Sequence, residues 1–230
     1  MALHRLTHIV MGVPNVAETA AYYTEFGLRP SGDGQATPDE RTFATVDGGE
    51  QLTIVRSRQR QLVRLGIGVD DPDDLDRVSA ALAALGVPAG RNEISVRADD
   101  PGTGVADDPG TGVPVRVEIA ARVAQQPTPA PACNEVGRGA SAMLEADPSR
   151  HTWGLGRHFI GSSFFWYLKD PAGNFSKYYS DLDCIGDDAR WQPGVWEGAR
   201  SLWAWGPPPP SSFLAPDDLR ALMAGAHQAP

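Results

Sequence analysis

Cysteine is scarce in this chain, and long apolar runs are missing from it. The 230 residues include only Cys133 and Cys184, which supply neither a disulfide framework nor the paired spacing of a cysteine metal site. No apolar run approaches the length of a membrane span, and the first residues lack the apolar core of a signal peptide. We therefore expect a cytoplasmic protein without a membrane partner.

Clustered basic residues are also missing. The formal net charge is −9, and no stretch of arginine or lysine is suited to contact a phosphate backbone. Nucleic acid is therefore not an expected partner. Hydrophobic residues make up 41% of the chain and charged residues 21%, which is ordinary for a globular protein. The length allows one large or two small domains, so we expect an enzyme or a small-molecule-binding protein.

An aromatic-rich segment, residues 153–185, is the most informative part of the chain. Residues 162–169 and 175–179 are both rich in strand-forming aromatic side chains. Between them lies DPAGN, in which proline fixes φ, glycine tolerates positive φ, and the Asp and Asn side chains can bond local backbone. The pattern predicts a β-hairpin. Strand alternation divides its second strand into one face with Phe175, Lys177 and Tyr179 and another with Ser176 and Tyr178.

The first 120 residues repeat one order of elements. Residues 6–13 predict a strand, and Asn15 followed by Glu18 predicts the start of a helix that Gly27 ends. Short strands are predicted at 28–30, 42–46 and 51–55. A second copy begins at 62–69, which aligns with 6–13 without a gap. Its helix starts at Asp71 and Pro72 and runs toward Gly86, and its later strands are predicted at 94–97 and 115–119.

These patterns predict an α+β fold with paired βαβββ modules in residues 1–120. The string ADDPGTGV occurs twice in succession, at 98–105 and 106–113, and predicts a lengthened exposed loop. Residues 121–132 are rich in proline, alanine and glutamine and predict a linker. Residues 133–185 predict a partial module, with a helix at 134–146 followed by the hairpin.

Residues 186–230 predict an irregular tail rich in tryptophan and proline. Trp191, Trp196, Trp203 and Trp205 precede the proline run 207–210. Large aromatic rings and a stiff, extended proline run favour a strap packed on the hairpin, with the wall of a ligand pocket as the alternative. A short final helix is predicted at 216–223, with acidic residues in its first turn.

Several strings in and after the hairpin segment carry a family resemblance. They are GRH at 156–158, GS at 161–162, Tyr167, DP at 170–171, Gly173 and YYSD at 178–181. Together they resemble the C-terminal end of extradiol ring-cleavage dioxygenases of the catechol 2,3-dioxygenase and dihydroxybiphenyl dioxygenase types. Those enzymes belong to the vicinal oxygen chelate superfamily, which also includes glyoxalase I. The tail string WGPPPPSSFLAP resembles the same family.

The resemblance implies paired βαβββ modules that form a cup around a divalent metal, Fe(II) or Mn(II). Ring-cleaving relatives have four modules, whereas this chain has two and part of a last one, without the segment that carries both metal histidines of the catalytic half. Lys177 stands where the family has a glutamate that ligates iron with two histidines. A protonated lysine cannot be that ligand and would repel the dication.

The resemblance also points to a metal-ligand position on the first strand of a module, which His8 occupies here. The matching position in the second copy is Arg64, and the candidate positions on the last strands are near Gln51 and near Arg116 or Glu118. His8 with Glu118 would complete at most half of a coordination shell. We therefore expect a degenerate metal site and assign no metal ligand.

The same comparison supplies candidate catalytic residues. His158 and Tyr167 match family positions that handle protons and hydrogen-bond the catechol or the iron-bound oxygen. Lys177 is suited to bind a phenolate or carboxylate, or to act as a base if it is desolvated. The alternatives are a surface histidine, a packed tyrosine and a solvated lysine. We further predict contacts with substrate from Arg157, Phe165 and Tyr179.

Three functions remain open at this point. The first is a divergent extradiol-dioxygenase homologue that binds or processes an aromatic or phenolic small molecule without the family's Fe(II) site. The second is an active metal-dependent dioxygenase with unidentified ligands, and the third is a non-catalytic protein that sequesters a small molecule. The partial module exposes a strand edge and an apolar face, so we also expect a homodimer unless the tail covers them.

Overall fold

The chain folds into two compact units. The computed structural model describes residues 3–31, 37–45, 49–85, 115–122, 133–183, 192, 194–198 and 201–218. One unit comprises Met1–Gln125 with Asp218–Pro230, and the other comprises Gln126–Asp217. Each unit has its own sheet, and each is described by itself below.

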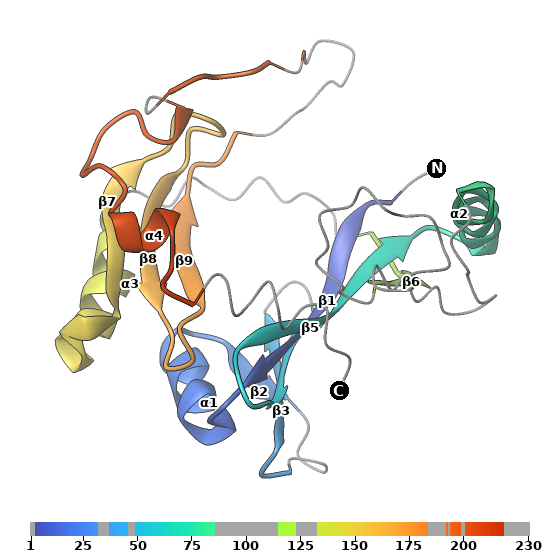
Figure 1. Cartoon of the computed structure of the whole chain (residues 1–230), viewed down its shortest axis with the longest axis horizontal. Helices are drawn as coiled ribbons and strands as arrows, with labels where there is room; N and C mark the ends of the chain where they lie inside the picture. Colours follow the sequence, from blue (N-terminus) through green and yellow to red (C-terminus); the bar gives the residue numbers. More distant parts are fainter. Residues whose placement is uncertain are drawn as a thin grey trace. The chain divides into compact units, whose positions relative to one another are not determined.

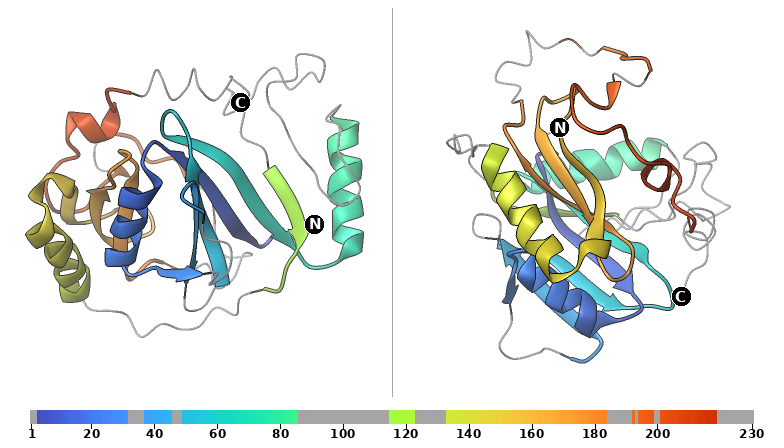
Figure 2. Two further views of the ribbon diagram at one scale, coloured as in Figure 1. Left: turned by 90° about the horizontal axis from the view of Figure 1, so that it is seen from below. Right: turned by 90° about the vertical axis from the view of Figure 1, so that its left-hand side faces the viewer.

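The first unit contains a sheet with the strand order β2-β3-β4-β1-β5-β6. Helix α1 packs against β3 and β4 on one face of this sheet (Figure 2). The elements follow the chain in this order: β1 (Arg5–Val13), α1 (Val16–Glu25), β2 (Arg29–Ser31), β3 (Glu40–Thr45), β4 (Gly49–Arg56), β5 (Gln61–Val69), α2 (Pro72–Ala84) and β6 (Val115–Ile119).

The pairing of these strands shows a repeated module. In the first module β1 pairs parallel with the last strand, β4, and in the second β5 pairs parallel with β6. The two opening strands, β1 and β5, pair antiparallel and join the modules. The first βαβββ order is therefore confirmed. The strand predicted at 94–97 and the doubled loop at 98–113 lie outside the described residues.

Both helices of this unit begin where the sequence places their caps. The Asn15 side chain accepts a hydrogen bond from the Glu18 backbone at 3.2 Å and donates one to the Glu18 carboxylate at 2.9 Å. Asp71 caps α2 by accepting from the Asp74 backbone at 2.8 Å, and Pro72 occupies the first turn. These contacts satisfy backbone donors that a helix start otherwise leaves free.

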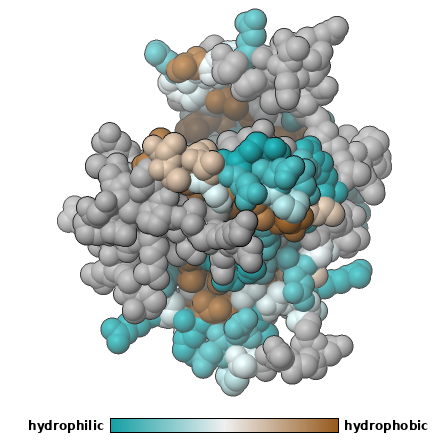
Figure 3. Space-filling view, turned by 90° about the vertical axis from the view of Figure 1, so that its right-hand side faces the viewer, coloured by the Kyte–Doolittle hydropathy of each residue, from teal (hydrophilic) through white to brown (hydrophobic). Residues whose placement is uncertain are grey.

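Apolar residues at the predicted spacings form the cores of the two modules. Val13, Val16, Tyr22, Phe43 and Ile54 are fully buried between α1 and the sheet. In the second module the buried cluster consists of Val69, Leu75, Val78 and Val117. On the side of the molecule seen in Figure 3, hydrophobic and hydrophilic residues are interspersed over the described surface. None of the helices in the described part of the chain is both long and apolar enough to cross a bilayer.

The second unit contains an antiparallel sheet in the order β7-β8-β9, which includes the predicted hairpin (Figure 1). Helix α3 covers one face and packs against β8 and β9. The short helix α4 contacts β7, and its Phe213 lies against rings on the other face. The elements are α3 (Cys133–Ala146), the 3-10 helix η1 (Pro148–Arg150), β7 (His151–Arg157), β8 (Phe164–Lys169), β9 (Phe175–Ser180) and α4 (Ser211–Leu214).

The turn between β8 and β9 forms as the DPAGN string predicts. The Asp170 carboxylate accepts hydrogen bonds from the backbone and side-chain nitrogens of Asn174, at 2.8 and 2.9 Å. Gly173 adopts φ +93°, a conformation that glycine tolerates without strain. Strand β8 begins at Phe164, later than predicted, because Gly161 and Ser162 have positive φ angles of 73° and 55° and cannot continue a strand.

The described part of the tail contains a short helix that was not predicted. The segment forms a helix at Ser211–Leu214, whereas residues 216–218 of the helix predicted at 216–223 are not helical. Pro216 explains the early end, because a proline disfavours helical angles in the preceding residue, and Ala215 has φ −142° and ψ 81°. Residues 219–223 of the predicted helix lie outside the described residues, as do 123–132 of the predicted linker and Trp191.

Candidate functional site

The site is built on the face of the β7-β8-β9 sheet that lies opposite α3, which we call the site face. Strand register places Trp153 beside Tyr167, Tyr167 beside Lys177, and Phe165 beside Tyr179. Cross-strand neighbours point to the same side of a sheet, so these five side chains share the face. The site face therefore combines aromatic rings with one cation.

His158 follows β7 directly and joins the site face from its edge. Its Nδ1 lies 2.7 Å from the Leu202 carbonyl oxygen, and its Nε2 lies 3.2 Å from the Tyr167 hydroxyl. A carbonyl can only accept, so the proton of the neutral ring resides on Nδ1. Nε2 then accepts a hydrogen bond from the Tyr167 hydroxyl. This arrangement orients a basic nitrogen and a phenol proton toward each other.

The surroundings of this pair favour its neutral form. Burial lowers the pKa of His158 from its ordinary value, and the nearby charge of Lys177 lowers it further, against the opposing effect of the Leu202 carbonyl. Burial also raises the pKa of Tyr167. At neutral pH the pair is therefore an uncharged imidazole and an uncharged phenol, which suits proton transfer by His158 acting as a base.

Lys177 provides the positive charge of the site face. Its Nζ lies 5.6 Å from the centre of the Tyr167 ring and 4.9 Å from the centre of the Tyr179 ring. Both distances fall within the range of cation–π attraction. Burial lowers the pKa of this amine. Lys177 and Tyr179 therefore share one face of the sheet, as predicted.

Two buried rings hold the His158–Tyr167 pair in place. Phe165 is fully buried and stacks on the His158 ring with 4.1 Å between centroids. Trp153 is buried as well, stacks on Tyr167 at an interplanar angle of 7°, and donates its indole N–H to the Pro207 carbonyl at 2.7 Å. Because neither ring is exposed, both act on the site by fixing the position of the polar side chains.

The tail completes the site by pairing with the edge of β7. The Arg157 backbone N–H donates to the Trp205 carbonyl at 3.0 Å and its carbonyl accepts from the Ala204 N–H at 2.8 Å. Gly206 has φ +106°, and a Cβ there would lie 2.7 Å from Gly156 Cα. This close approach explains the glycine at 206, whereas a Cβ at Gly156 would lie 2.7 Å from the Phe165 ring. It also brings the Leu202 carbonyl to His158.

The short helix α4 adds a further ring to the site face. Phe213 packs against Trp153, Tyr167 and Phe175, with centroid distances of 5.0, 4.8 and 5.2 Å. Its contacts agree with the expected strap. They also place an apolar ring beside Tyr167, and the alternative, the wall of a ligand pocket, stays a prediction.

The structure brings five of the six predicted site residues together. His158, Tyr167, Lys177 and Tyr179 line the site face, and Phe165 lies beneath it. Arg157 instead pairs with Phe164 across the strands and lies over that ring at 4.5 Å. Its guanidinium donates to Ser162 at 2.8 Å and to the Asp181 carboxylate at 2.7 Å, so it ties the ends of β7 and β9 together.

Three contributors were not among the predicted site residues: Trp153, Phe213 and the Leu202 carbonyl. Trp153 could have been found by extending the strand pattern upstream of GRH. Phe213 lies within the WGPPPPSSFLAP string that carries the family resemblance. A backbone carbonyl has no side-chain signature, so no sequence signal could have identified Leu202.

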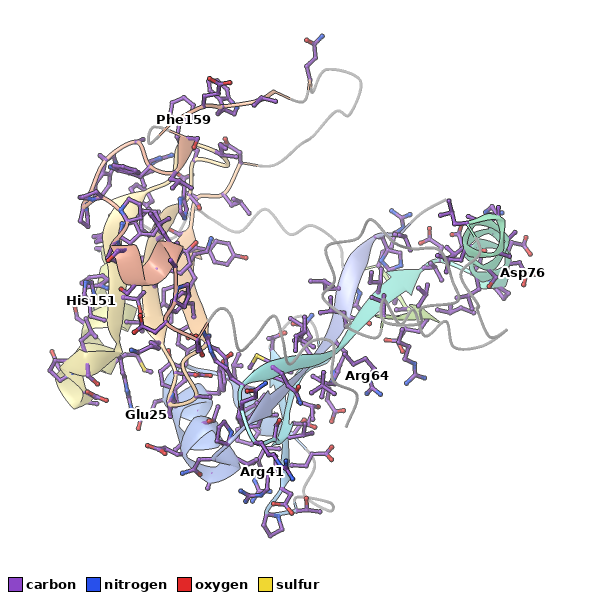
Figure 4. All side chains as sticks on the ribbon, in the orientation of Figure 1. Glu25, Arg41, Arg64, Asp76, His151 and Phe159 are labelled. Atoms are coloured by element: carbon purple, nitrogen blue, oxygen red, sulfur yellow. The ribbon has the colours of Figure 1, made fainter. Side chains whose placement is uncertain are left out.

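Other histidines of the described chain have other partners. His151, at the start of β7 (Figure 4), accepts a hydrogen bond from the Trp166 indole at 3.0 Å. His8 on β1 lies 3.4 Å from the Glu50 carbonyl oxygen. Glu118, its proposed co-ligand, accepts instead from Thr7 at 2.6 Å and lies 3.4 Å from the Arg116 side chain.

The described residues do not supply a set of ligands for a resident iron or manganese ion. Within the described ranges, His, Cys, Asp and Glu side chains form no group of three that could hold a metal. Lys177, at the family's carboxylate position, is a cation that packs between tyrosine rings. An ammonium offers no lone pair to a metal while it is protonated. No chemical step is therefore assigned to a metal here.

Comparison with solved structures identifies the fold. A Mn(II)-bound glyoxalase from Novosphingobium aromaticivorans matches with a TM-score of 0.68 at 15% identity, over 93% of this chain and 95% of that one. A variant of homoprotocatechuate 2,3-dioxygenase from Brevibacterium fuscum, in complex with HPCA, matches with a TM-score of 0.70 at 14% identity, over 92% and 81%. The chain has the α+β fold of the vicinal oxygen chelate proteins, and the predicted fold class is confirmed.

A comparison of sequences adds one particular relative. Metapyrocatechase 2 from Cupriavidus necator is 43% identical to this chain over 81 residues. That stretch is 35% of this chain and 25% of the relative, so the match spans about a quarter of the relative's length. No protein-family model matches the chain. The resemblance to extradiol dioxygenases is confirmed by this relative and by the solved structures.

Proposed function

We propose that this chain is a divergent homologue of extradiol ring-cleavage dioxygenases that binds or processes an aromatic or phenolic small molecule on the site face, without the family's Fe(II) site. The observation that carries the proposal is the neutral His158–Tyr167 pair beside Lys177. His158 and Tyr167 are groups that can hydrogen-bond a phenol and accept its proton. The cation Lys177 stands where the family has its metal-binding carboxylate.

The exposed part of the site face supports an aromatic ligand. Tyr179 is 55% exposed and presents its ring beside Lys177, whereas Phe165 and Trp153 are already buried. A ligand ring can therefore stack on Tyr179 and reach the Tyr167 hydroxyl. Stacked or edge-on ring pairs stabilise a complex by about 0.5–1.5 kcal/mol beyond the area that they bury. One solved neighbour, homoprotocatechuate 2,3-dioxygenase, carries 3,4-dihydroxyphenylacetate in its substrate complex.

In this site His158 is the residue suited to move a proton. The lone pair of its Nε2 faces the Tyr167 hydroxyl, so a phenolic proton can pass to His158 through that hydroxyl. Lys177 would balance the negative charge that remains on the ligand oxygen. Arg157 has no direct role in this proposal, because its guanidinium bonds Ser162 and Asp181.

Metal analysis combined with ligand binding tests the proposal. The protein purified after exposure to Fe(II) should hold far less than one iron per chain, bind catechol, and consume no oxygen. Stoichiometric iron or manganese with oxygen uptake on catechol would establish the competing function, an active metal-dependent dioxygenase. The stretch shared with metapyrocatechase 2 is the observation that favours this second function.

The iron content of the Lys177→Glu variant tests whether the other metal ligands are present in the chain. If the metal histidines are missing from the chain, restoring a carboxylate at this position should leave the iron content low. Recovery of iron by this single change would show that the other ligands are present. Tight binding of catechol without turnover under any condition would instead favour the third function, a protein that sequesters small molecules.

Two further parts of the proposal concern assembly and location. The homodimer rests on β9, which in the described part of the chain pairs only with β8 and leaves one edge open. Sedimentation of the purified protein should give the mass of two chains, and a monomer over the whole concentration range would contradict this. The cytoplasmic location rests on composition, and fractionation of the producing cells tests it.

A further inference from the structure

Within the described residues, Lys177 carries a charge that has no acidic partner. None of the described carboxylates forms an ion pair with it, although Arg157, Arg60, Arg77 and Arg122 all pair with aspartates. Its Nζ lies instead over the faces of the Tyr167 and Tyr179 rings. A half-buried ammonium without an anion is unfavourable, because charges that leave water are usually paired. The position is therefore suited to receive an anion.

The titratable groups that face Lys177 add no negative charge. They come from each strand of the sheet: His158 after β7, Tyr167 on β8 and Tyr179 on β9. The part of α4 beside the site contributes Phe213, which is apolar. His158 is neutral at physiological pH and Tyr167 keeps its proton. An incoming anion would meet a cation and a hydroxyl and no repelling charge.

We propose that the site binds a phenol as its phenolate, with the anionic oxygen beside Lys177 Nζ and within reach of the Tyr167 hydroxyl. The inference rests on the proposed function, because it names the charge state of the aromatic ligand at the same site. The phenolic O–H bond breaks and its electron pair stays on oxygen. The proton passes through the Tyr167 hydroxyl to His158 Nε2 and from there to solvent, which leaves the phenolate beside the ammonium of Lys177.

The probe for this inference is 4-nitrophenol, whose phenolate absorbs at longer wavelength than its phenol. Titration of the bound probe should show an apparent pKa about 1 unit below that of the free probe, which corresponds to about tenfold tighter binding of the phenolate than of the phenol. The uncharged methyl ether, 4-nitroanisole, reports ring binding alone. Equal affinity for both charge states would overturn the inference.

The chain offers a matched control, since its lysines are Lys169 and Lys177 only. Lys177→Met should abolish the preference for phenolate while leaving the binding of 4-nitroanisole within about twofold, and Lys177→Arg should retain the preference. Lys169, at the exposed end of β8 beside the turn, should be replaceable by Met without effect. A Lys177→Met variant that keeps the tenfold preference would refute the role of this amine.

The experiment separates failure of this inference from failure of the proposed function. If the wild-type protein binds 4-nitroanisole and 4-nitrophenol equally, the site accepts aromatic rings but the anion inference is wrong. If it binds neither compound, both the anion inference and aromatic binding are wrong. Unchanged binding of 4-nitroanisole by Lys177→Met shows that its loss of the phenolate preference does not come from misfolding.

Discussion

His158 and Tyr167 are joined by a hydrogen bond of 3.2 Å between the imidazole Nε2 and the phenol oxygen, and the opposite ring nitrogen is held by the Leu202 carbonyl. The histidine thus has a defined proton position that depends on a residue 44 positions away in sequence. Because His158 contacts both the sheet and the tail, a change in either should alter the NMR signals of its imidazole ring.

The first prediction concerns the pH dependence of stability. Burial lowers the pKa of His158 in the folded state, while the unfolded chain has a value near about 6.5. As the pH falls through about 6.5, the unfolded state binds a proton that the folded state does not, so the free energy of unfolding decreases. The decrease levels off below the folded-state pKa, and above about 6.5 there is no effect.

Urea unfolding at pH about 7.5 and about 5.5 checks this expectation, with His158→Asn as the variant that lacks the titrating ring. The wild type should lose more stability than the variant between the two conditions. Proton NMR of the histidine C–H signals gives the pKa directly. A His158 resonance that titrates at or above about 6.5 would contradict the prediction.

The second prediction concerns Lys177 and the cost of its charge. Burial lowers its pKa, so at neutral pH the unfolded state holds this proton more favourably than the folded state does. Lys177→Met should therefore produce a small rise in the free energy of unfolding at pH about 7. The gain should disappear as the pH rises from the folded-state pKa toward about 10.5.

Carbon-13 methylation of the amines makes this measurable by NMR, because the chain has only two lysines. Lys177→Arg assigns the Lys177 signal by removing it. The assigned signal should titrate below the ordinary lysine value. If Lys177→Met loses ligand affinity and also gains stability, Lys177 would show the trade-off between function and stability that is common at binding sites. A destabilised Lys177→Met protein at neutral pH would argue against the prediction.

The third prediction concerns the glycine that lets the tail approach β7. Gly206→Ala would place a Cβ 2.7 Å from Gly156 Cα and 2.8 Å from the Leu155 carbonyl oxygen, at φ +106°. We expect a loss of about 2 kcal/mol or more in the free energy of unfolding of the second unit. Gly198→Ala is the control, because Gly198 also has positive φ but a Cβ there meets nothing within 4 Å.

The control should cost only about 1 kcal/mol, from backbone strain alone. In Gly206→Ala the His158 signals should also change, since displacement of the tail removes the Leu202 acceptor. Equal losses in the two variants would mean that the close approach to Gly156 contributes nothing to stability.

The fourth prediction concerns the indole of Trp153. Trp153→Phe removes the donor to the Pro207 carbonyl and leaves a smaller ring beneath the site. We expect a loss of about 2 kcal/mol, of which about 1 kcal/mol comes from the hydrogen bond. Trp166→Phe is the matched control, because its indole donates to His151 in an exposed setting. Chemical denaturation followed by circular dichroism should rank Trp153→Phe as the more damaging change, and the reverse order would refute it.

Local sequence patterns predicted much of the fold. The Asn15 and Asp71 caps, the DPAGN turn and the alternation through Lys177 and Tyr179 depend on neighbouring residues, so a short window contains the information. The recurrence of the module was predicted because residues 62–69 repeat the pattern of 6–13, whereas the parallel pairing of its first and last strands was not. The resemblance to vicinal oxygen chelate proteins then predicted that the modules are paired βαβββ units.

Contacts between distant segments could not be predicted in the same way. Arg157 belongs to the GRH string, yet register and the Asp181 carboxylate direct its guanidinium to Phe164. Helix α4 was not predicted, and it ends at Leu214 because Pro216 disfavours helical angles at Ala215. Strand β7 was not predicted, because Gly154 and Gly156 weaken the strand signal of the segment that Trp153 begins upstream of GRH.

The antiparallel bridge between Arg157 and Trp205 has a consequence for any shortened form of this protein. A chain cut after residue 200 would keep all three strands and every polar group of the sheet. It would nevertheless lose the carbonyl that selects one tautomer of His158, the indole's acceptor at Pro207 and the ring of Phe213. Such a fragment would retain the side chains that we propose to be catalytic, but the proton of His158 would no longer be held on one ring nitrogen.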